Sequence, residues 1–513
     1  MKKIFLFILP FVTGGVCHAE DITIRYDGLS AKVTQKAKDS VSVAVDGACV
    51  SIESLYKAHK LTLRLKGKSD NGQLVLNAAG KVQVTLDGLT LTSQEGAPLC
   101  LKNKKKAEVI AAKGTQNTLT ITACNDTVNN KAATIWAKDK LLLSGKGTLN
   151  VIATGDGCRG IKTKKDITIE GLTLNVTTSG NNLGEKPFGF GGFPEMPEGG
   201  FPGFGNDSTM QGGFPGFPGM PMGGFPMPND STMRSGFPGF PGMPEGGFQM
   251  PEGGFPDFGG FLGFGNDSIE GGFGGGFGGK HKYVASTKGI ASKGKITINS
   301  GNITVRTNTA GAEGIEGKEG VVFNGGNVDI QSPDDAVNAS ACIEFNGANV
   351  IARSMGNDAV DSNPAGGFFM PFGGSNSQDT TPAIIVRGGT VYAWSQVGSP
   401  EEGLDCDFAP IVVEGGTIFT VGGGMGEMPS VPTNATAKQP TVLLIGLNIV
   451  KDSPITISNA NGKPIDTITV PFAMRRSASL VSSPAFKVGE TYTVKTKDYD
   501  KSITISENFT IVR

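Results

Sequence analysis

Histidine is the residue this chain has least of, apart from tryptophan. Three His occur among 513 residues, and only His59 and His281 lie beyond the first nineteen positions. Neither belongs to the regular part of the sequence described below. A Ser-His-Asp or Cys-His catalytic site needs a histidine base beside its nucleophile, so the sequence argues against both. Hydrolysis by paired carboxylates stays open, because Asp and Glu together number 47.

An excess of charge is also lacking. Lys and Arg number 46 against 47 Asp and Glu, for a formal net charge of −1. Nucleic-acid binding usually needs a strongly basic surface, so no nucleic-acid partner is expected. The seven cysteines form no CxxC pair and show no zinc-ligand spacing. We expect most of them to be small buried residues.

Long hydrophobic runs are absent except near the start. Residues 4–12 are apolar, Lys2 and Lys3 precede them, and Cys17-His18-Ala19 follows. This pattern is typical of a secretory signal peptide, here residues 1–19, cleaved after Ala19. The run is too short to span a bilayer, so no transmembrane anchor is expected. The sequence thus predicts a secreted, periplasmic or cell-surface protein.

What the sequence does contain is a short repeat. The segments ITINSGNITVRT (from 296), VVFNGGNVDIQS (from 321) and IVVEGGTIFTVG (from 411) each read as a strand, a Gly turn and an alternating strand. A small and an apolar residue precede each unit, as at Gly314-Ile315. Units of about 25 residues cannot bury a face alone, but stacked coils bury one continuous interior. This predicts an all-β fold, a right-handed parallel β-helix (a solenoid) of about eight to nine coils.

Two segments interrupt the predicted β-helix of residues 20–428. Residues 184–280 carry GFGGFPEMPEGGFPGFG and its variants, and residues 364–381 have the same Gly, Pro and Phe bias. Such segments lack a helical or strand period and are expected to be disordered. The long insert is either a tolerated loop or an apolar arm for glycan, partner or self-association.

Both ends of the predicted helix look different from its middle. Residues 21–75 read as irregular strands that cap the first coil. Residues 429–513 alternate at period two around turn residues such as Asn461-Gly462. They predict an antiparallel β module, with a cap favoured over a sorting or attachment domain.

Three tripeptides in the long insert share one pattern: Asp207-Ser208-Thr209, Asp230-Ser231-Thr232 and Asp267-Ser268-Ile269. They resemble the acceptor motif for periplasmic O-glycosylation in Bacteroidetes. The resemblance implies modification at Ser208, Ser231 and Ser268 and a source in that phylum.

Acidic residues gather at aligned positions of three successive repeats. Rungs of a parallel β-helix stack about 4.8 Å apart, so aligned carboxylates repel strongly unless a cation neutralises them. Several oxygen ligands with flexible spacing suit Ca²⁺. The alternative is a solvated acidic face that holds no ion. The candidate ligands are Asp334, Asp335, Asp358, Asp361, Glu402, Asp405 and Asp407.

The units GDGCRGIKTKKDITIEGLTLNV, SPDDAVNASACIEFNGANV and GNDAVDSN resemble the secreted bacterial carbohydrate-binding β-helix family, which is pectate-lyase-like in fold. The resemblance covers roughly residues 80 to 425 without the inserts. It implies binding of plant-type or acidic polysaccharide, with Ca²⁺ at the stacked Asp positions.

Three functions follow from these patterns. A carbohydrate-binding protein is favoured. The alternatives are a surface structural or adhesive protein and a Ca²⁺-assisted polysaccharide lyase, whose base would be Lys318 or Arg353. In the third strand, Tyr392 and Trp394 alternate outward, and such a pair could stack on sugar rings. The alternative is that the insert or the C-terminal module covers them.

Overall fold

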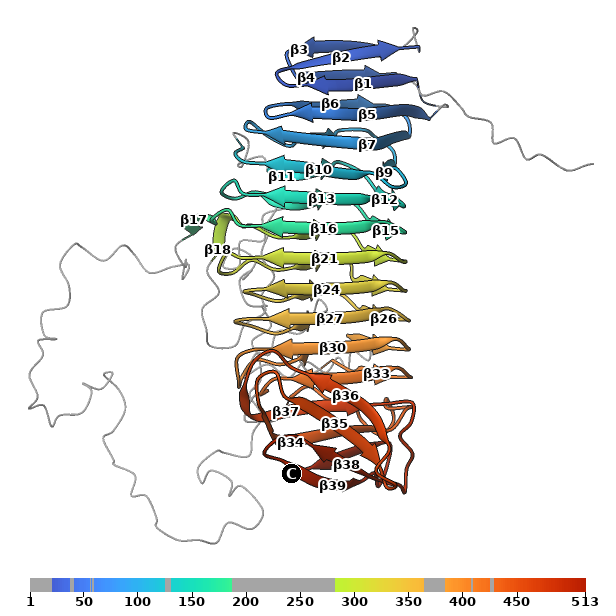
Figure 1. Ribbon diagram of the computed structural model, residues 1–513, viewed down its shortest axis with the longest axis vertical. Coiled ribbons are helices and arrows are strands. Elements are labelled where there is room, and N and C mark those ends of the chain that lie inside the picture. Colours follow the sequence, from blue (N-terminus) through green and yellow to red (C-terminus); the bar gives the residue numbers. More distant parts are fainter. Residues whose placement is uncertain are drawn as a thin grey trace, which may run out of the picture. The chain divides into compact units, whose positions relative to one another are not determined.

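The computed structural model describes residues 21–36, 41–55, 57, 60–124, 131–186, 282–363, 383–406, 409–424 and 429–513. Every regular element among them is a β-strand (Figure 1). No helix capable of crossing a membrane occurs in this part of the chain. Several predictions lie outside the described residues: the signal peptide, nearly all of both inserts, Asp407, Ser208, Ser231 and Ser268.

Each coil contributes a first strand to an eleven-stranded sheet in which every neighbouring pair except β3–β4 is parallel. The first strands are β4 (Cys49–Ser54), β6 (Gln73–Ala78), β8 (Leu99–Leu101), β11 (Ala133–Ala137), β14 (Arg159–Thr163), β19 (Ile290–Ser292), β22 (Ile315–Gly317), β25 (Val337–Ala339), β28 (Val360–Ser362) and β31 (Leu404–Asp405).

The second and third strands of the coils lie together in a 23-stranded sheet. The second strands are β9 (Ala107–Ala111), β12 (Leu141–Gly145), β15 (Ile167–Glu170), β20 (Ile296–Ile298), β23 (Val321–Phe323), β26 (Ile343–Phe345), β29 (Ile384–Val386) and β32 (Ile411–Val413). The third strands are β10 (Gln116–Ile121), β13 (Thr148–Ala153), β16 (Thr173–Thr178), β21 (Asn302–Thr307), β24 (Asn327–Ser332), β27 (Asn349–Ser354), β30 (Thr390–Ser395) and β33 (Thr417–Val421).

Side-chain alternation decides what fills the coils. Val328 and Ile330 of β24 are buried, whereas Asn327 is exposed, as the period-two pattern predicts. Phe323 and Phe345 stack inside neighbouring coils with ring centroids 5.0 Å apart. One continuous apolar cluster runs from Ile22 to Leu480, so the coils share a single interior.

The N-terminal strands differ from the prediction of a mere irregular cap. The hairpins β1 (Ile22–Asp27)–β2 (Ser30–Gln35) and β3 (Val41–Asp46)–β4 do close this end. However, β1 already pairs in parallel with β5 (Leu61–Ser69), and β5 with β7 (Val82–Ser93). The parallel stack therefore begins before the recognisable repeat. In β5 and β7 the second and third strands of a coil run on as one long strand, with Gly67 and Gly88 at positive φ inside them.

The two ends of the long insert meet. β17 (Leu183–Lys186) pairs antiparallel with β18 (Lys282–Ala285). The side chain of Asn182 donates to the Ala310 carbonyl at 2.7 Å and accepts from the Thr287 amide at 2.8 Å. The chain thus leaves and re-enters the stack at one place.

The C-terminal segment joins the last coil directly. β37 (Met474–Ser482) pairs antiparallel with β33, and β34 (Thr441–Ile449) pairs with β37 and β40 (Phe509–Val512). A separate four-stranded antiparallel sheet lies beside them (Figure 1). Its strands are, in spatial order, β36 (Pro464–Thr469), β35 (Pro454–Asn459), β38 (Thr491–Lys495) and β39 (Asp500–Thr504).

Candidate functional site

The outward side chains of the first strands form a column. The strand register pairs Lys162 with Ala291, and Ala291 with Glu316. It continues from Glu316 through Asn338 and Asp361 to Asp405. The turns that enter these strands add further charges. We use the name ionic row for the whole set: Arg159, Lys162, Lys288, Glu313, Glu316, Asp334, Asp335, Asp358, Asp361, Glu402 and Asp405.

Burial distinguishes the ionic row from a solvated acidic face, which was the alternative to a cation site. Asp335 is 0% exposed, Asp361 2%, Glu402 7% and Asp358 8%. An isolated buried charge is costly unless it is paired or hydrogen-bonded. The local partners of each group therefore decide its charge state.

At the basic end, Lys288 holds two carboxylates. Its Nζ lies 2.8 Å from Glu313 Oε2 and 2.7 Å from Glu316 Oε2. Burial opposes the charged form of Lys288, but the two carboxylates outweigh it and raise the lysine pKa. Burial also opposes ionisation of Glu316, yet Lys288 and Lys318 lower its pKa to about 2. This end of the row is a compensated ion-pair network.

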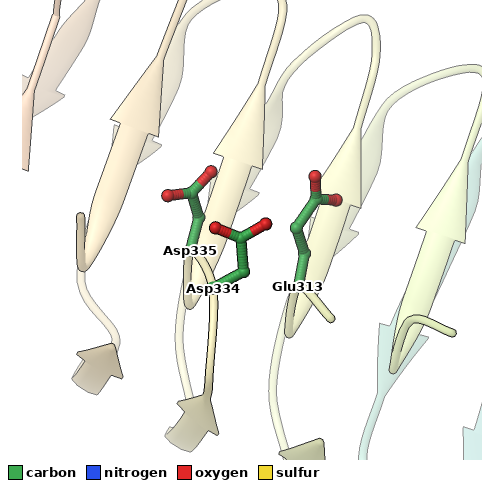
Figure 2. Close-up of side chains that lie close together, drawn as sticks. All are labelled: Glu313, Asp334 and Asp335. Carbon is green, nitrogen blue, oxygen red and sulfur yellow. The ribbon is translucent and has the colours of Figure 1, made fainter. Parts of the chain in front are cut away.

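Three carboxylates gather at the edge of that network, and one of them, Glu313, belongs to both (Figure 2). Glu313, on one rung, and Asp334 and Asp335, on the next, each offer an oxygen within 4.8 Å of the others. Asn357 donates to Asp334 Oδ1 at 2.8 Å, and Asn338 donates to Asp335 Oδ2 at 2.9 Å. The donor set consists of hard oxygens, as Ca²⁺ prefers, and Glu313 and Asp334 are only partly buried.

Glu313 was not among the predicted ligands. The signal for it was present, because Glu313 occupies the same turn position, one coil earlier, as Asp335. Glu313 also pairs with Lys288. Burial and then the neighbouring Glu316 raise the pKa of the Glu313 carboxyl.

The remaining predicted ligands make their own contacts. Asn363 donates to both Asp361 oxygens, at 2.8 and 2.9 Å. The Ser430 amide donates to Glu402 Oε2 at 2.6 Å, and its hydroxyl to Asp405 Oδ1 at 3.1 Å. Within the described residues these acids do not join the three-carboxylate cluster. The predicted ligand set is therefore divided between two places.

Asp358 lies between these two places. Its Oδ1 accepts the Glu402 amide at 2.5 Å. Burial, followed by the charges of Asp335 and Asp405, raises the pKa of Asp358 well above its usual value. A nearby cation would reverse this effect.

The two candidate lyase bases lie on different sheets. Lys318 follows β22 of the eleven-stranded sheet and forms an ion pair with Glu316 at 2.6 Å. Arg353 lies on β27 of the 23-stranded sheet. Of the two, only Lys318 adjoins the sheet that carries the ionic row, where it pairs with Glu316.

Tyr392 and Trp394 point out of the coil, as the alternation predicts, but neither side chain is freely exposed to solvent. The rings of Tyr392 and Trp394 stack with centroids 5.8 Å apart. Trp394 is only 5% exposed and belongs to a buried cluster with C-terminal residues such as Ile455 and Val470. The Tyr392 hydroxyl donates to Asp466 at 3.3 Å. Since the C-terminal module covers Trp394, the predicted exposed pair for sugar stacking is corrected to an interdomain contact.

Comparison with known proteins shows which part of the chain is similar to a described family. A family model described as "Carbohydrate-binding domain-containing protein" matches residues 22–186 and 269–359. The chain resembles the carbohydrate-binding domain family over these two segments. They include Glu313, Asp334, Asp335 and Asp358, and they extend to the N-terminal strands that the repeat pattern left out.

One relative and one solved structure complete the comparison. A carbohydrate-binding domain-containing protein of Acetivibrio thermocellus is 28% identical over 138 residues, which are 26% of this chain and 48% of that protein. The match thus spans about half the length of this relative. A polysaccharide lyase-like protein from C. thermocellum aligns at 17% identity with a TM-score of 0.37, over 64% of this chain and 90% of that one.

Proposed function

We propose that this protein is exported and binds polysaccharide without cleaving it, with Ca²⁺ held by the ionic row. The family resemblance supports carbohydrate binding. The observation that carries the calcium proposal is the cluster of Glu313, Asp334 and Asp335, with oxygens within 4.8 Å. A plant-type or other acidic glycan suits this arrangement best.

The chemistry of the cluster explains why an acidic glycan is proposed. Three carboxylates at this spacing repel one another in a partly buried site. Ca²⁺ relieves that repulsion and takes six to eight oxygen ligands, more than these three side chains supply. Glu313, Asp334 and Asp335 would hold the ion, and because Glu313 and Asp334 are only partly buried, the carboxylate of a uronic acid could supply a further ligand. Calcium would then link protein and glycan.

Retention on immobilised polygalacturonate tests the proposal. The full chain is expected to be retained in Ca²⁺ and released, at least in part, by chelator, while neutral dextran retains none. The double variant Glu313→Gln, Asp334→Asn should lose the calcium-dependent part. Asp498→Asn, which removes an exposed carboxylate in the C-terminal module, should behave as wild type.

The same assay separates the alternatives. An unsaturated product that absorbs in the ultraviolet would replace the binder with a lyase. No retention on any glycan, with self-association of the protein instead, would favour a structural or adhesive role. Equal retention of wild type and the double variant would remove calcium from the proposal.

A further inference from the structure

A second set of charged side chains lies on a different face of the coils, on the outward side of the third strands. Arg306 of β21 is paired in register with Gln331 of β24. Gln331 is paired in turn with Arg353 of β27. All three are partly exposed. Two arginines therefore stand two rungs apart, about 10 Å, in one column.

Positive charge on this column is not fully compensated. Arg306 forms an ion pair with Asp329 and donates to the Asp329 carbonyl at 2.8 Å. Arg353 donates to the Gln331 side-chain oxygen, and no carboxylate of the described residues pairs with it. Burial, followed by repulsion from Arg306, lowers the pKa of Arg353, and the charge of Asp329 offsets this only in part. A bound anion would favour the charged form of Arg353 and so oppose both effects.

Apolar surface accompanies the arginines. Ile351 is 37% exposed, and it lies in the adjacent column between Asp329 and Tyr392. Beyond Ile351 on this column, Tyr392 is half-buried and its hydroxyl donates to Asp466 of the C-terminal module, so the strip ends at Ile351. Guanidinium groups beside an exposed isoleucine match a sugar that carries an anionic group and an apolar CH face.

We propose that Arg306, Gln331, Arg353 and Ile351 form a binding strip for an extended anionic glycan, and that this strip needs no calcium. The arginines bind carboxylate or sulfate groups two rungs apart, Gln331 bonds to a hydroxyl between them, and Ile351 contacts a ring. The inference rests on the proposed glycan-binding function but uses another face of the coils. Arg353 contributes most, because it has no carboxylate partner within the described residues.

Binding in the presence of chelator tests the strip. The probes are polygalacturonate, dextran sulfate and neutral dextran, titrated against the full chain by calorimetry. Arg353→Gln should weaken binding to the anionic probe about tenfold, as loss of one charge-assisted, two-pronged contact predicts. Arg353→Lys keeps the charge but not the planar, two-pronged guanidinium group. Its affinity for the anionic probe should lie between those of wild type and Arg353→Gln. Arg25→Gln, an exposed arginine of β1, is the matched charge control and should leave binding unchanged.

The outcomes separate the strip from the ionic row. Binding of polygalacturonate alone identifies carboxylate as the ligand, binding of dextran sulfate alone identifies sulfate, and either supports the strip. Wild type that binds only with Ca²⁺, or Arg353→Gln that binds as well as Arg25→Gln, overturns the strip and leaves the proposed function intact. Wild type that binds no glycan in either buffer overturns both.

Discussion

At the scale of single residues, the immediate neighbours of a buried charged group, rather than the chain's net charge, determine whether its burial is compensated. Lys288 and Asp358 occupy equivalent turns of different coils, and both are buried. Lys288 has two carboxylate partners at 2.8 and 2.7 Å, so its burial is compensated. Asp358 has acidic neighbours and accepts a hydrogen bond from a backbone amide. The burial of its negative charge is therefore not compensated. The two residues should therefore respond to substitution in opposite ways.

Lys288→Met should destabilise the fold strongly. It leaves the buried Glu316 and the partly buried Glu313 without their shared cation, and breaking a buried pair in this way costs about 3 to 5 kcal/mol. Denaturant unfolding followed by circular dichroism measures the loss. Lys140→Met is the control, since its pair with Asp166 at 2.7 Å is largely exposed, and it should lower the stability far less. Equal losses in the two variants would contradict the assigned role of Lys288.

Asp358 should make calcium-free protein less stable as pH rises. Its folded-state pKa lies above the ordinary value, so the native state binds the proton more tightly than the unfolded chain does. This contribution is fully present below the unfolded pKa and is lost as pH rises through the folded pKa. Asp358→Asn mimics the protonated form and should flatten the decline of Tm above pH 4 in chelator. An unchanged pH profile would show that Asp358 is ionised in the fold.

At the scale of the strand and turn, close approach between rungs explains the repeat signature. A Cβ on Gly314 would lie 2.5 Å from the Ala336 carbonyl oxygen and 2.4 Å from Ile330 Cγ2, which explains the small residue before each first strand. Stacked asparagines support the turns, with Asn324 donating to Asn299 at 2.9 Å and Asn346 to Asn324 at 2.8 Å. These side chains satisfy one another, so their alignment reflects structure rather than a ligand.

Removal of residues 187–281 should leave the coils intact. β17 and β18 pair across the ends of this segment, so a short Gly/Ser turn can join Lys186 to Lys282 as a hairpin. The far-ultraviolet spectrum should stay strand-rich, and the Tm should change little. Loss of soluble protein would show that the segment is needed for folding. Asn182→Ala is a useful companion variant, because it removes contacts to Ala310 and Thr287 and should loosen this junction.

At the scale of the whole described chain, the C-terminal segment completes the last coils. Trp394 and Phe419 belong to one buried cluster with Ile455, Val470 and Tyr492. β33 also uses its edge to pair with β37. An uncovered β edge beside apolar side chains promotes association between chains. The segment therefore covers the last coil, and we expect it to act as a cap for the stack.

Truncation after residue 424 should expose Trp394 and the edge of β33, and the product should aggregate. The chain has two tryptophans, so a Trp136→Phe background makes fluorescence report Trp394 alone. Its emission should be blue-shifted in the full chain and red-shifted after truncation. Size-exclusion chromatography measures aggregation, and full-length Trp394→Ala should remain dispersed. A monomeric truncation with unchanged emission would refute the capping role.

The sequence by itself determines the repeat, the all-β class, the inward parity of Val328 and Ile330, and the alignment of Asn338, Asp361 and Asp405. These follow from local periodicity, because side chains alternate along every strand and rungs stack at a constant spacing. Only the tertiary structure decides that Asp335 and Asp361 are buried, that Lys288 rather than solvent faces Glu313, and that the C-terminal module covers Trp394. Burial and pairing depend on what packs against a residue from distant parts of the chain, and periodicity carries no information about that.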